Sequence, residues 1–86
     1  MGVSITMSEY NPRLKRLVLE VVDNQVRDNN PPETKATLER LMKSGHSRKE
    51  AREMIGAAIA TQIWEIMVQE AEFDEAKYSA ELRKLK

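Results

Sequence analysis

The segment from residue 47 to residue 70 constrains the fold of this chain more than any other. Its middle part, "IGAAIATQIW" at 55–64, contains no charged residue. At helical spacing, one side of the segment carries Ala51, Met54, Ile55, Ala58, Ile59, Ile63 and Ile66, and Ala57, Ala60, Trp64, Met67 and Val68 cover most of the rest. A helix that is apolar nearly all round is usually buried. We therefore expect a central helix that other helices cover, or one face of which meets a second copy of the chain.

The residues just before this segment have the pattern of a helix boundary. Gly45 suits the left-handed position that ends a helix, and Ser47 with Glu50 forms the Ser-x-x-Glu capping box that starts the next one. His46, the only histidine, lies between them. A general base needs a nucleophile and an orienting partner, and neither is evident around His46. We interpret His46 as an exposed loop residue.

Two helices are predicted before residue 45. Asn11 is a good N-cap with Pro12 in the first turn, and "DNNPP" at 28–32 ends that helix and starts the next at Pro32. The apolar positions are Leu14, Leu17, Val18, Val21, Val22 and Val26 in the first helix and Ala36, Leu38, Leu41 and Met42 in the second.

A fourth helix is predicted after Asp74, which suits an N-cap. Phe73 and Tyr78 occupy the two positions of a hydrophobic staple, and Leu82 and Leu85 continue the stripe. No strand-like alternation is present. The sequence therefore predicts an all-α, single four-helix domain over 10–86, with helices at about 11–29, 32–44, 47–70 and 74–85, helix three central, and a flexible N-terminus over 1–9.

Composition excludes several classes of function. The 86 residues include 14 basic and 14 acidic side chains, whereas a general nucleic-acid or anionic-membrane binder usually has a basic excess. No apolar run approaches the roughly 18 residues of a membrane span. The absence of cysteine removes disulfides and thiolate metal sites, and we expect a cytoplasmic protein. An apolar fraction of 41% in so short a chain predicts a thin core, which favours self-association.

Four blocks of the sequence carry a resemblance to a known family. "NPRLKRLVLEVVDNQ", "NPPETKATLERL", "SRKEA" and "IWE", in this order, resemble a bacterial family of small helical proteins of unknown function. The resemblance implies a helical fold and no established activity. Members often carry HxxxH pairs in the first helix and early in the third. Here those positions hold Lys15, Leu19, Lys49 and Glu53, of which three are not ordinary metal ligands, so we expect no metal site of that kind.

The charges of the segment 47–70 raise the question of an anion site. Arg48, Lys49 and Arg52 crowd the positive end of the helix dipole, where backbone amides at 45–47 and the cations could receive a phosphate or carboxylate. The possible anion site is therefore Ser47, Arg48 and Lys49. The plainer interpretation is that these charges are solvated or pair across helices.

Acidic residues are also weak candidates for metal ligands. Five of them lie between Glu65 and Glu75, without the spacing or the glycine turn of a calcium loop. Glu20 with Glu53 lacks an accompanying Glu-x-x-His, and the helical pattern places Glu20 on the polar face. We interpret all of these as solvated surface and expect no metal and no cofactor.

Two further features concern packing. Gln25 and Gln62 lie within apolar helical faces, so each needs a hydrogen-bond partner, and we expect them to pair with each other. Trp64 lies on the less apolar flank of the third helix. Either it packs under the last helix, which we favour slightly, or it anchors an interface made of Ala57, Ala60, Trp64 and Val68.

These observations favour a non-enzymatic helical interaction module. Its partner would be an unknown protein or, through helix three, a second copy, with no nucleic acid and no membrane. The alternative is a small-ligand, anion or metal-binding protein related to a histidine-rich form. No nucleophile–base pair, glycine-rich phosphate loop or cofactor motif supports an enzyme.

Overall fold

The computed structural model describes residues 12–86, which form four α-helices and no strand. The helices are α1 (Pro12–Asp28), α2 (Pro32–Lys43), α3 (Arg48–Gln69) and α4 (Glu75–Lys84). The predicted all-α, four-helix architecture is confirmed, with each boundary within one residue of the expected one. The expected flexible segment 1–9 and the expected N-cap Asn11 lie outside the described residues.

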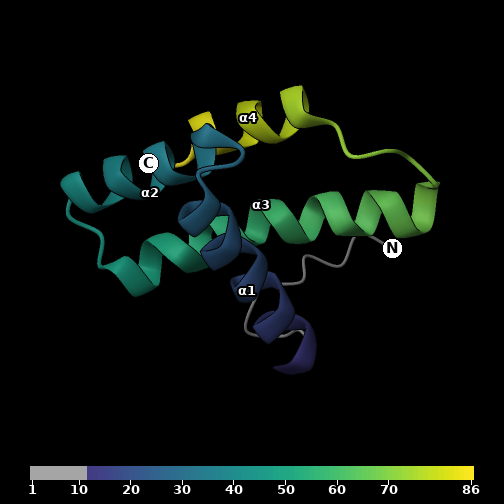
Figure 1. The fold of residues 1–86 in the computed structure, drawn as a ribbon, viewed down its shortest axis with the longest axis horizontal. Coiled ribbons are helices and arrows are strands. Elements are labelled where there is room, and N and C mark those ends of the chain that lie inside the picture. The colour runs from purple at the N-terminus through teal and green to yellow at the C-terminus, as the bar shows by residue number, and fades with distance from the viewer. Residues whose placement is uncertain (1–11) are drawn as a thin grey trace.

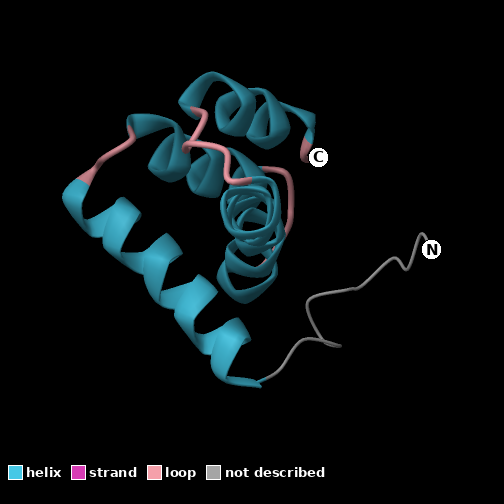
Figure 2. Ribbon diagram, turned by 90° about the vertical axis from the view of Figure 1, so that its right-hand side faces the viewer, coloured by secondary structure: helices cyan, strands magenta, loops and turns pink. Residues whose placement is uncertain are grey.

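Helix α3 is the central element, as predicted, because it contacts each of the other three helices. Figure 1 shows α3 along the long axis of the molecule, with α1 crossing it steeply. In Figures 1 and 2, α2 and α4 lie together on one side of α3. This arrangement leaves the last turns of α3 extending beyond α1 and α2 (Figure 1).

Local sequence signals explain where the helices begin and end. Gly45 has a φ of 107°, and its amide and that of His46 donate to the carbonyls of Met42 and Leu41, which closes the end of α2. Asn29 ends α1 in the same way with a φ of 50°. The predicted left-handed glycine is confirmed, and the predicted stop at "DNNPP" is formed by Asn29 in the same left-handed conformation.

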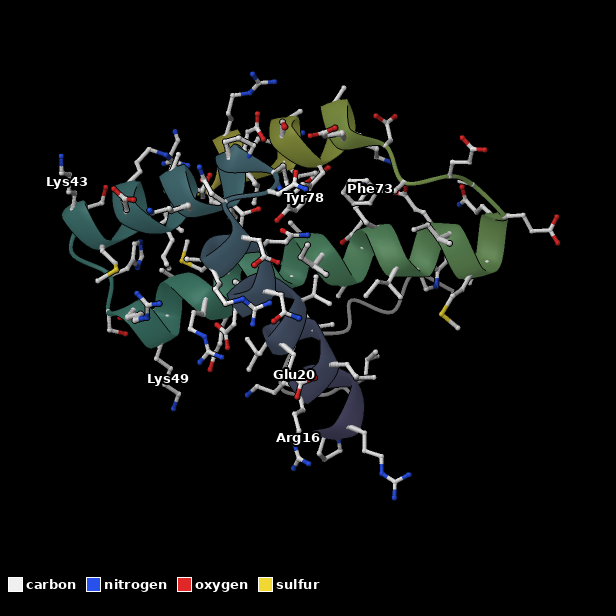
Figure 3. The ribbon with its side chains drawn as sticks, in the orientation of Figure 1. Arg16, Glu20, Lys43, Lys49, Phe73 and Tyr78 are labelled. Carbon is white, nitrogen blue, oxygen red and sulfur yellow. The ribbon has the colours of Figure 1, made fainter. Side chains whose placement is uncertain are left out.

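The N-terminal caps of α3 and α4 are also confirmed. The Ser47 Oγ accepts from the Glu50 amide at 3.0 Å, and the Glu50 Oε1 accepts from the Ser47 amide at 2.9 Å. Asp74 caps α4 by accepting from the Lys77 amide. Phe73 and Tyr78 form the staple, with ring centroids 5.7 Å apart (Figure 3).

The core lies between α3 and the other helices. It consists of Val18 and Val22 from α1, Leu38 and Leu41 from α2, Ala51, Ile55, Ala58, Ile59 and Ala60 from α3, and Tyr78 and Leu82 from α4. Most of the predicted apolar positions are therefore buried or partly buried. The exceptions before residue 45 are Leu17, Ala36 and Met42, which are exposed, and on the predicted core side of helix three the exception is Ile66. In α2, Thr34 and Thr37 are buried instead, because α2 turns this side toward its neighbours.

Three polar groups meet inside the core. The Oγ1 of Thr34 donates to the Oε1 of Gln25 at 2.7 Å, and the Oη of Tyr78 lies 3.0 Å from each of these atoms. Gln25 therefore finds its partners on α2 and α4. The predicted Gln25–Gln62 pair is wrong, because Gln62 lies farther along α3 and accepts from the Asp74 amide at 3.4 Å.

The C-terminal end of α4 is held by side chains from outside the helix. Arg40 of α2 donates to the carbonyl oxygens of Leu82 and Leu85 at 2.9 and 2.7 Å. The Nε2 of His46 lies 3.0 Å from the main-chain oxygen of Lys86. The Arg40 contacts thus bind carbonyl oxygens at the C-terminal end of α4, where a helix leaves acceptors without intrahelical partners.

Candidate interaction surface

The last turns of α3 carry large apolar side chains that face solvent. Trp64 is 53% exposed, Met67 75% and Val68 59%. Of the two alternatives expected for α3, coverage by the other helices therefore does not hold for its last turns, and contact with a second copy stays a prediction. The reason is length: 22 residues span about 33 Å, whereas the ten residues of α4 span about 15 Å. The neighbours cover the side of Ile55 and Ile59 but not the end of the helix.

A hollow of about 240 Å³ lies between this part of α3 and the first turn of α1. It is lined by Leu14, Ala60, Ile63, Trp64, Met67 and Val68. None of these side chains is charged or titratable, so the hollow offers apolar surface and shape but no acid, base or nucleophile. Such a surface suits the apolar face of another molecule and does not suit acid–base chemistry.

Three of the four residues of the predicted interface line this hollow, namely Ala60, Trp64 and Val68. Ala57 is exposed and lies outside the lining. The interpretation that Trp64 packs under the last helix is wrong, because Trp64 is half exposed and shares the hollow with Leu14 of α1.

Leu14, Ile63 and Met67 also line this hollow, and none of them belongs to the interface predicted from the sequence. Met67 and Ile63 were recognisable only as apolar positions of α3. Leu14 belongs to another helix, and its place beside Trp64 depends on the angle at which α1 crosses α3. The spacing of apolar residues along a helix does not predict this angle.

The predicted anion site divides into two parts. Ser47 is occupied, because its amide and its hydroxyl both bind Glu50. Hydrogen bonding with Ser47, chiefly the bond that its amide donates to the carboxylate, lowers the pKa of the Glu50 carboxyl, which keeps a negative charge at the start of α3. At the N-terminal end of α3, the Ser47 amide therefore already binds the carboxylate of Glu50 and is not available to an external anion.

Arg48 and Lys49 line a second, open hollow of about 530 Å³, together with Asp23, Val26, Arg27 and Arg52. Arg52 binds Asp23 through two hydrogen bonds of 2.8 Å. Within residues 12–86, the side chains of Arg48 and Lys49 have no hydrogen bond or ion pair. Their part of the predicted site stays a prediction.

His46 is half buried rather than freely exposed, and its ring contacts Lys86. Its contact is with a main-chain oxygen and serves the end of α4. The part of the chain that the structure describes places no nucleophile in hydrogen-bond contact with the ring of His46.

Carboxylates do not gather into a metal site in the described region. Among residues 12–86, no group of three or more His, Cys, Asp or Glu side chains is placed to hold a metal ion. Glu53 pairs with Lys15 at 3.8 Å, so two of the positions singled out by the family resemblance face each other across α1 and α3. Glu20 is exposed, one turn from Arg16 on α1 (Figure 3).

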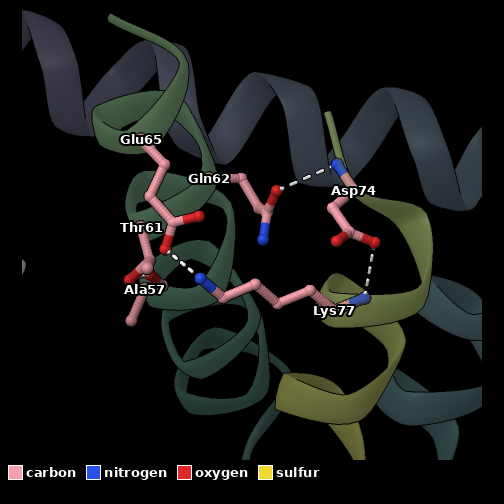
Figure 4. A network of polar contacts seen from close by, with 6 residues as sticks. All are labelled: Ala57, Thr61, Gln62, Glu65, Asp74 and Lys77. Atoms are coloured by element: carbon pink, nitrogen blue, oxygen red, sulfur yellow. Dashed lines mark hydrogen bonds and ion pairs between the residues drawn. The ribbon is translucent and has the colours of Figure 1, made fainter. Parts of the chain in front are cut away.

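A polar network joins α3 to the start of α4, beside the exposed end of α3. Lys77 forms an ion pair with Glu65, which raises the pKa of the Lys77 ammonium, and its amide binds Asp74 (Figure 4). Gln62 is buried within this network, and its Nε2 has no hydrogen-bond partner. The network ties the α3–α4 connection in place and leaves Trp64 on the opposite side of α3.

Comparison of the chain with protein-family models, with curated proteins and with solved structures finds no match in any of the three. The resemblance to a histidine-rich bacterial family therefore stays a prediction. No helix in the described part of the chain is both long and apolar enough to cross a bilayer.

Proposed function

We propose that this chain is a non-enzymatic helical protein-interaction module whose binding surface is the apolar hollow between α1 and α3. The observation that carries the proposal is the exposure of Trp64, Met67 and Val68 around one hollow. Contiguous exposed apolar surface on a small domain typically marks an interaction site, and tryptophan is the side chain most enriched among interface anchors.

The shape and lining of the hollow favour a helix as its occupant. Two helices form its walls, and a third apolar helix face fits such a groove by inserting side chains spaced three and four apart. A small charged ligand finds no counter-charge among Leu14, Ala60 and Ile63. Ala60, which also lines the hollow, has a small side chain, so the helix of a partner can approach α3 closely at this point.

Photo-crosslinking inside the cell tests the proposal. Val68 is replaced by benzoylphenylalanine, so that Trp64 is retained, and Glu39 on the exposed side of α2 is replaced in the same way as a control. We expect an adduct of discrete mass from position 68 only, lost when Trp64→Ala is added. Mass spectrometry identifies the captured protein, and titration of the two purified proteins measures its affinity. Equal adducts from positions 68 and 39 would contradict the proposal.

One observation favours a second candidate function, the binding of a phosphate-bearing anion. Arg48 and Lys49 line the second hollow together with Arg52, and their side chains form no ion pair among residues 12–86. Titration with inorganic phosphate, followed by NMR, tests this candidate. It predicts saturable shifts of the Arg48 and Lys49 amides that disappear in Arg48→Ser, whereas Lys35→Ser on α2 leaves them unchanged. Unmoved amides would exclude it.

A further inference from the structure

Met67 is the most exposed large apolar side chain in the described part of the molecule. It is 75% exposed, compared with 53% for Trp64 and 59% for Val68, and all three line the apolar hollow. The chain has five methionines and no cysteine, so methionine supplies all of its sulfur. The thioether of Met67 therefore places an oxidisable sulfur atom on the candidate interaction surface.

The two other methionines among residues 12–86 lie in different surroundings. Met54 is partly buried and packs against the core. Met42 is 41% exposed on α2 and does not line the hollow. The described region thus has one methionine at the hollow, one exposed elsewhere and one against the core, so each serves as a reference for the others.

A peroxide oxidises methionine to the sulfoxide, a reversible modification. The sulfur lone pair attacks one peroxide oxygen, the O–O bond breaks, and an S=O bond forms. Hydrogen peroxide leaves as water, so the sulfur loses two electrons and the peroxide gains them. Methionine sulfoxide reductases restore the thioether with two thiols, which form a disulfide and release the oxygen as water. The forward reaction requires access to the sulfur, which the exposure of Met67 provides.

The sulfoxide would change the chemistry of the hollow. It turns an apolar side chain into a polar one whose oxygen accepts hydrogen bonds. Among the side chains that line the hollow, only Trp64 carries a hydrogen-bond donor, its indole N–H, and the remaining ones are aliphatic. An apolar partner would therefore bury the sulfoxide with one donor at most. Burial of a poorly paired polar group opposes binding.

Resting on the proposed function, we infer that Met67 is a site of reversible oxidation by hydrogen peroxide or a related peroxide, and that its oxidation releases the partner from the hollow. In the free chain the sulfur is open to the oxidant, and in the complex the partner covers it. Oxidation and binding therefore exclude each other. The fold itself is unaffected, because Met67 lies outside the buried core.

Peptide mapping by mass spectrometry tests the first half of the inference. The purified full chain is incubated with hydrogen peroxide at neutral pH, and the sulfoxide at each methionine is measured over time. We expect Met67 to be oxidised roughly fivefold faster than Met54 or more, because oxidation follows exposure. The helical circular dichroism should not change. A rate at Met67 no higher than that at Met54 would overturn the inference.

Photo-crosslinking from position 68 tests the second half. The purified chain with benzoylphenylalanine at position 68 is oxidised until mapping shows complete conversion at Met67, freed of peroxide, and illuminated in an extract of the cells that produce it. We expect the specific adduct to fall roughly tenfold relative to the unoxidised chain. A methionine sulfoxide reductase with dithiothreitol should restore it.

Matched variants assign the effect to one sulfur atom. Met67→Leu keeps an apolar side chain of similar size without sulfur, so its adduct should withstand the same peroxide treatment. Met42→Leu removes the exposed methionine outside the hollow, and its adduct should be lost as in the wild type. Met67→Gln, which places a polar group at the position without any oxidant, should lower the yield before treatment.

Two crosslinking results would overturn the inference. The first is an adduct that survives complete oxidation of Met67, and the second is an adduct lost equally in Met67→Leu. In both cases the adduct formed by the unoxidised chain leaves the proposed function standing. If position 68 of the unoxidised chain captures nothing specific, the proposed function and the inference both fail.

Discussion

The hydroxyl of Tyr78 lies 3.0 Å from the Oε1 of Gln25, although 53 positions separate the two residues in the chain. Thr34 completes a triangle of oxygen atoms, so one cluster joins α1, α2 and α4. Two hydroxyl protons are available for the three contacts, so one contact is made without a proton between its oxygens. Thr34 and Tyr78 are fully buried and Gln25 partly so, and a mutually bound cluster of this kind specifies which residues of the three helices meet.

The Tyr78 hydroxyl makes the stability of the fold depend on pH. Burial, which outweighs the opposite effect of the hydrogen bond with Thr34, raises the pKa of Tyr78 to about 12. The folded chain thus keeps a proton that the unfolded chain loses near pH 10. Stability contributed by this group is complete below pH 10 and is lost as the pH rises toward 12, by on the order of 2 kcal/mol at about 1.4 kcal/mol per pKa unit.

Urea unfolding at pH 9 and pH 11 checks this dependence. Other groups titrate in the same range, so Tyr78→Phe is the reference, because it keeps the ring and removes the hydroxyl. We expect the wild type to lose more stability between the two pH values than Tyr78→Phe does. Equal losses would show that the hydroxyl titrates normally in the folded chain.

Removing the unpaired amide of Gln62 should stabilise the chain. Its Nε2 is buried without a partner, and its Oε1 accepts only a long hydrogen bond from Asp74. Gln62→Leu keeps the volume and removes the unsatisfied donor, so we expect a gain of up to about 1 kcal/mol. Gln62→Ala leaves a cavity and should cost about 2 kcal/mol. Chemical denaturation compares the two, and a Leu variant as unstable as the Ala variant would disprove the reasoning.

Glu70 ends α3 with a φ of 53°, a conformation that glycine adopts without strain. Its carboxylate also lies at the negative end of the helix dipole. We therefore expect Glu70→Gly to raise the free energy of unfolding by roughly 1 kcal/mol. Glu72→Gly is the matched control, because position 72 has no positive φ, and it should bring no gain. Thermal melts of monomeric samples would decide, and a loss in Glu70→Gly would contradict the prediction.

Arg40 is the residue whose loss should loosen α4 most selectively. It donates to the carbonyls of Leu82 and Leu85 and thereby ties α4 to α2. Arg40→Met keeps the aliphatic stem and removes both hydrogen bonds, so we expect a loss of about 1 kcal/mol and faster amide exchange in the last turn of α4. Lys35→Met, on the exposed side of α2, should change neither quantity. Unchanged exchange in Arg40→Met would show that the contact contributes nothing in solution.

Local signals in the sequence determined the helices and their ends. The Ser47–Glu50 capping box, the left-handed Gly45, and the Asp74 cap with its Phe73–Tyr78 staple act over a few residues, so a reader of the sequence can place them. The apolar run at 55–64 likewise determined that α3 is central, because only contact with the other helices covers Ile55 and Ile59.

Only the tertiary structure decided which apolar and polar side chains meet. Gln25 binds Tyr78 rather than Gln62, and Leu14 rather than α4 lies beside Trp64. Both outcomes depend on the crossing angle of α1 over α3 and on the short length of α4, which arise from packing among all four helices at once. A helical period shows which face of a helix is apolar, but it does not show where along that face the neighbouring helices end. At α3 they end before Trp64, and the candidate interaction surface begins there.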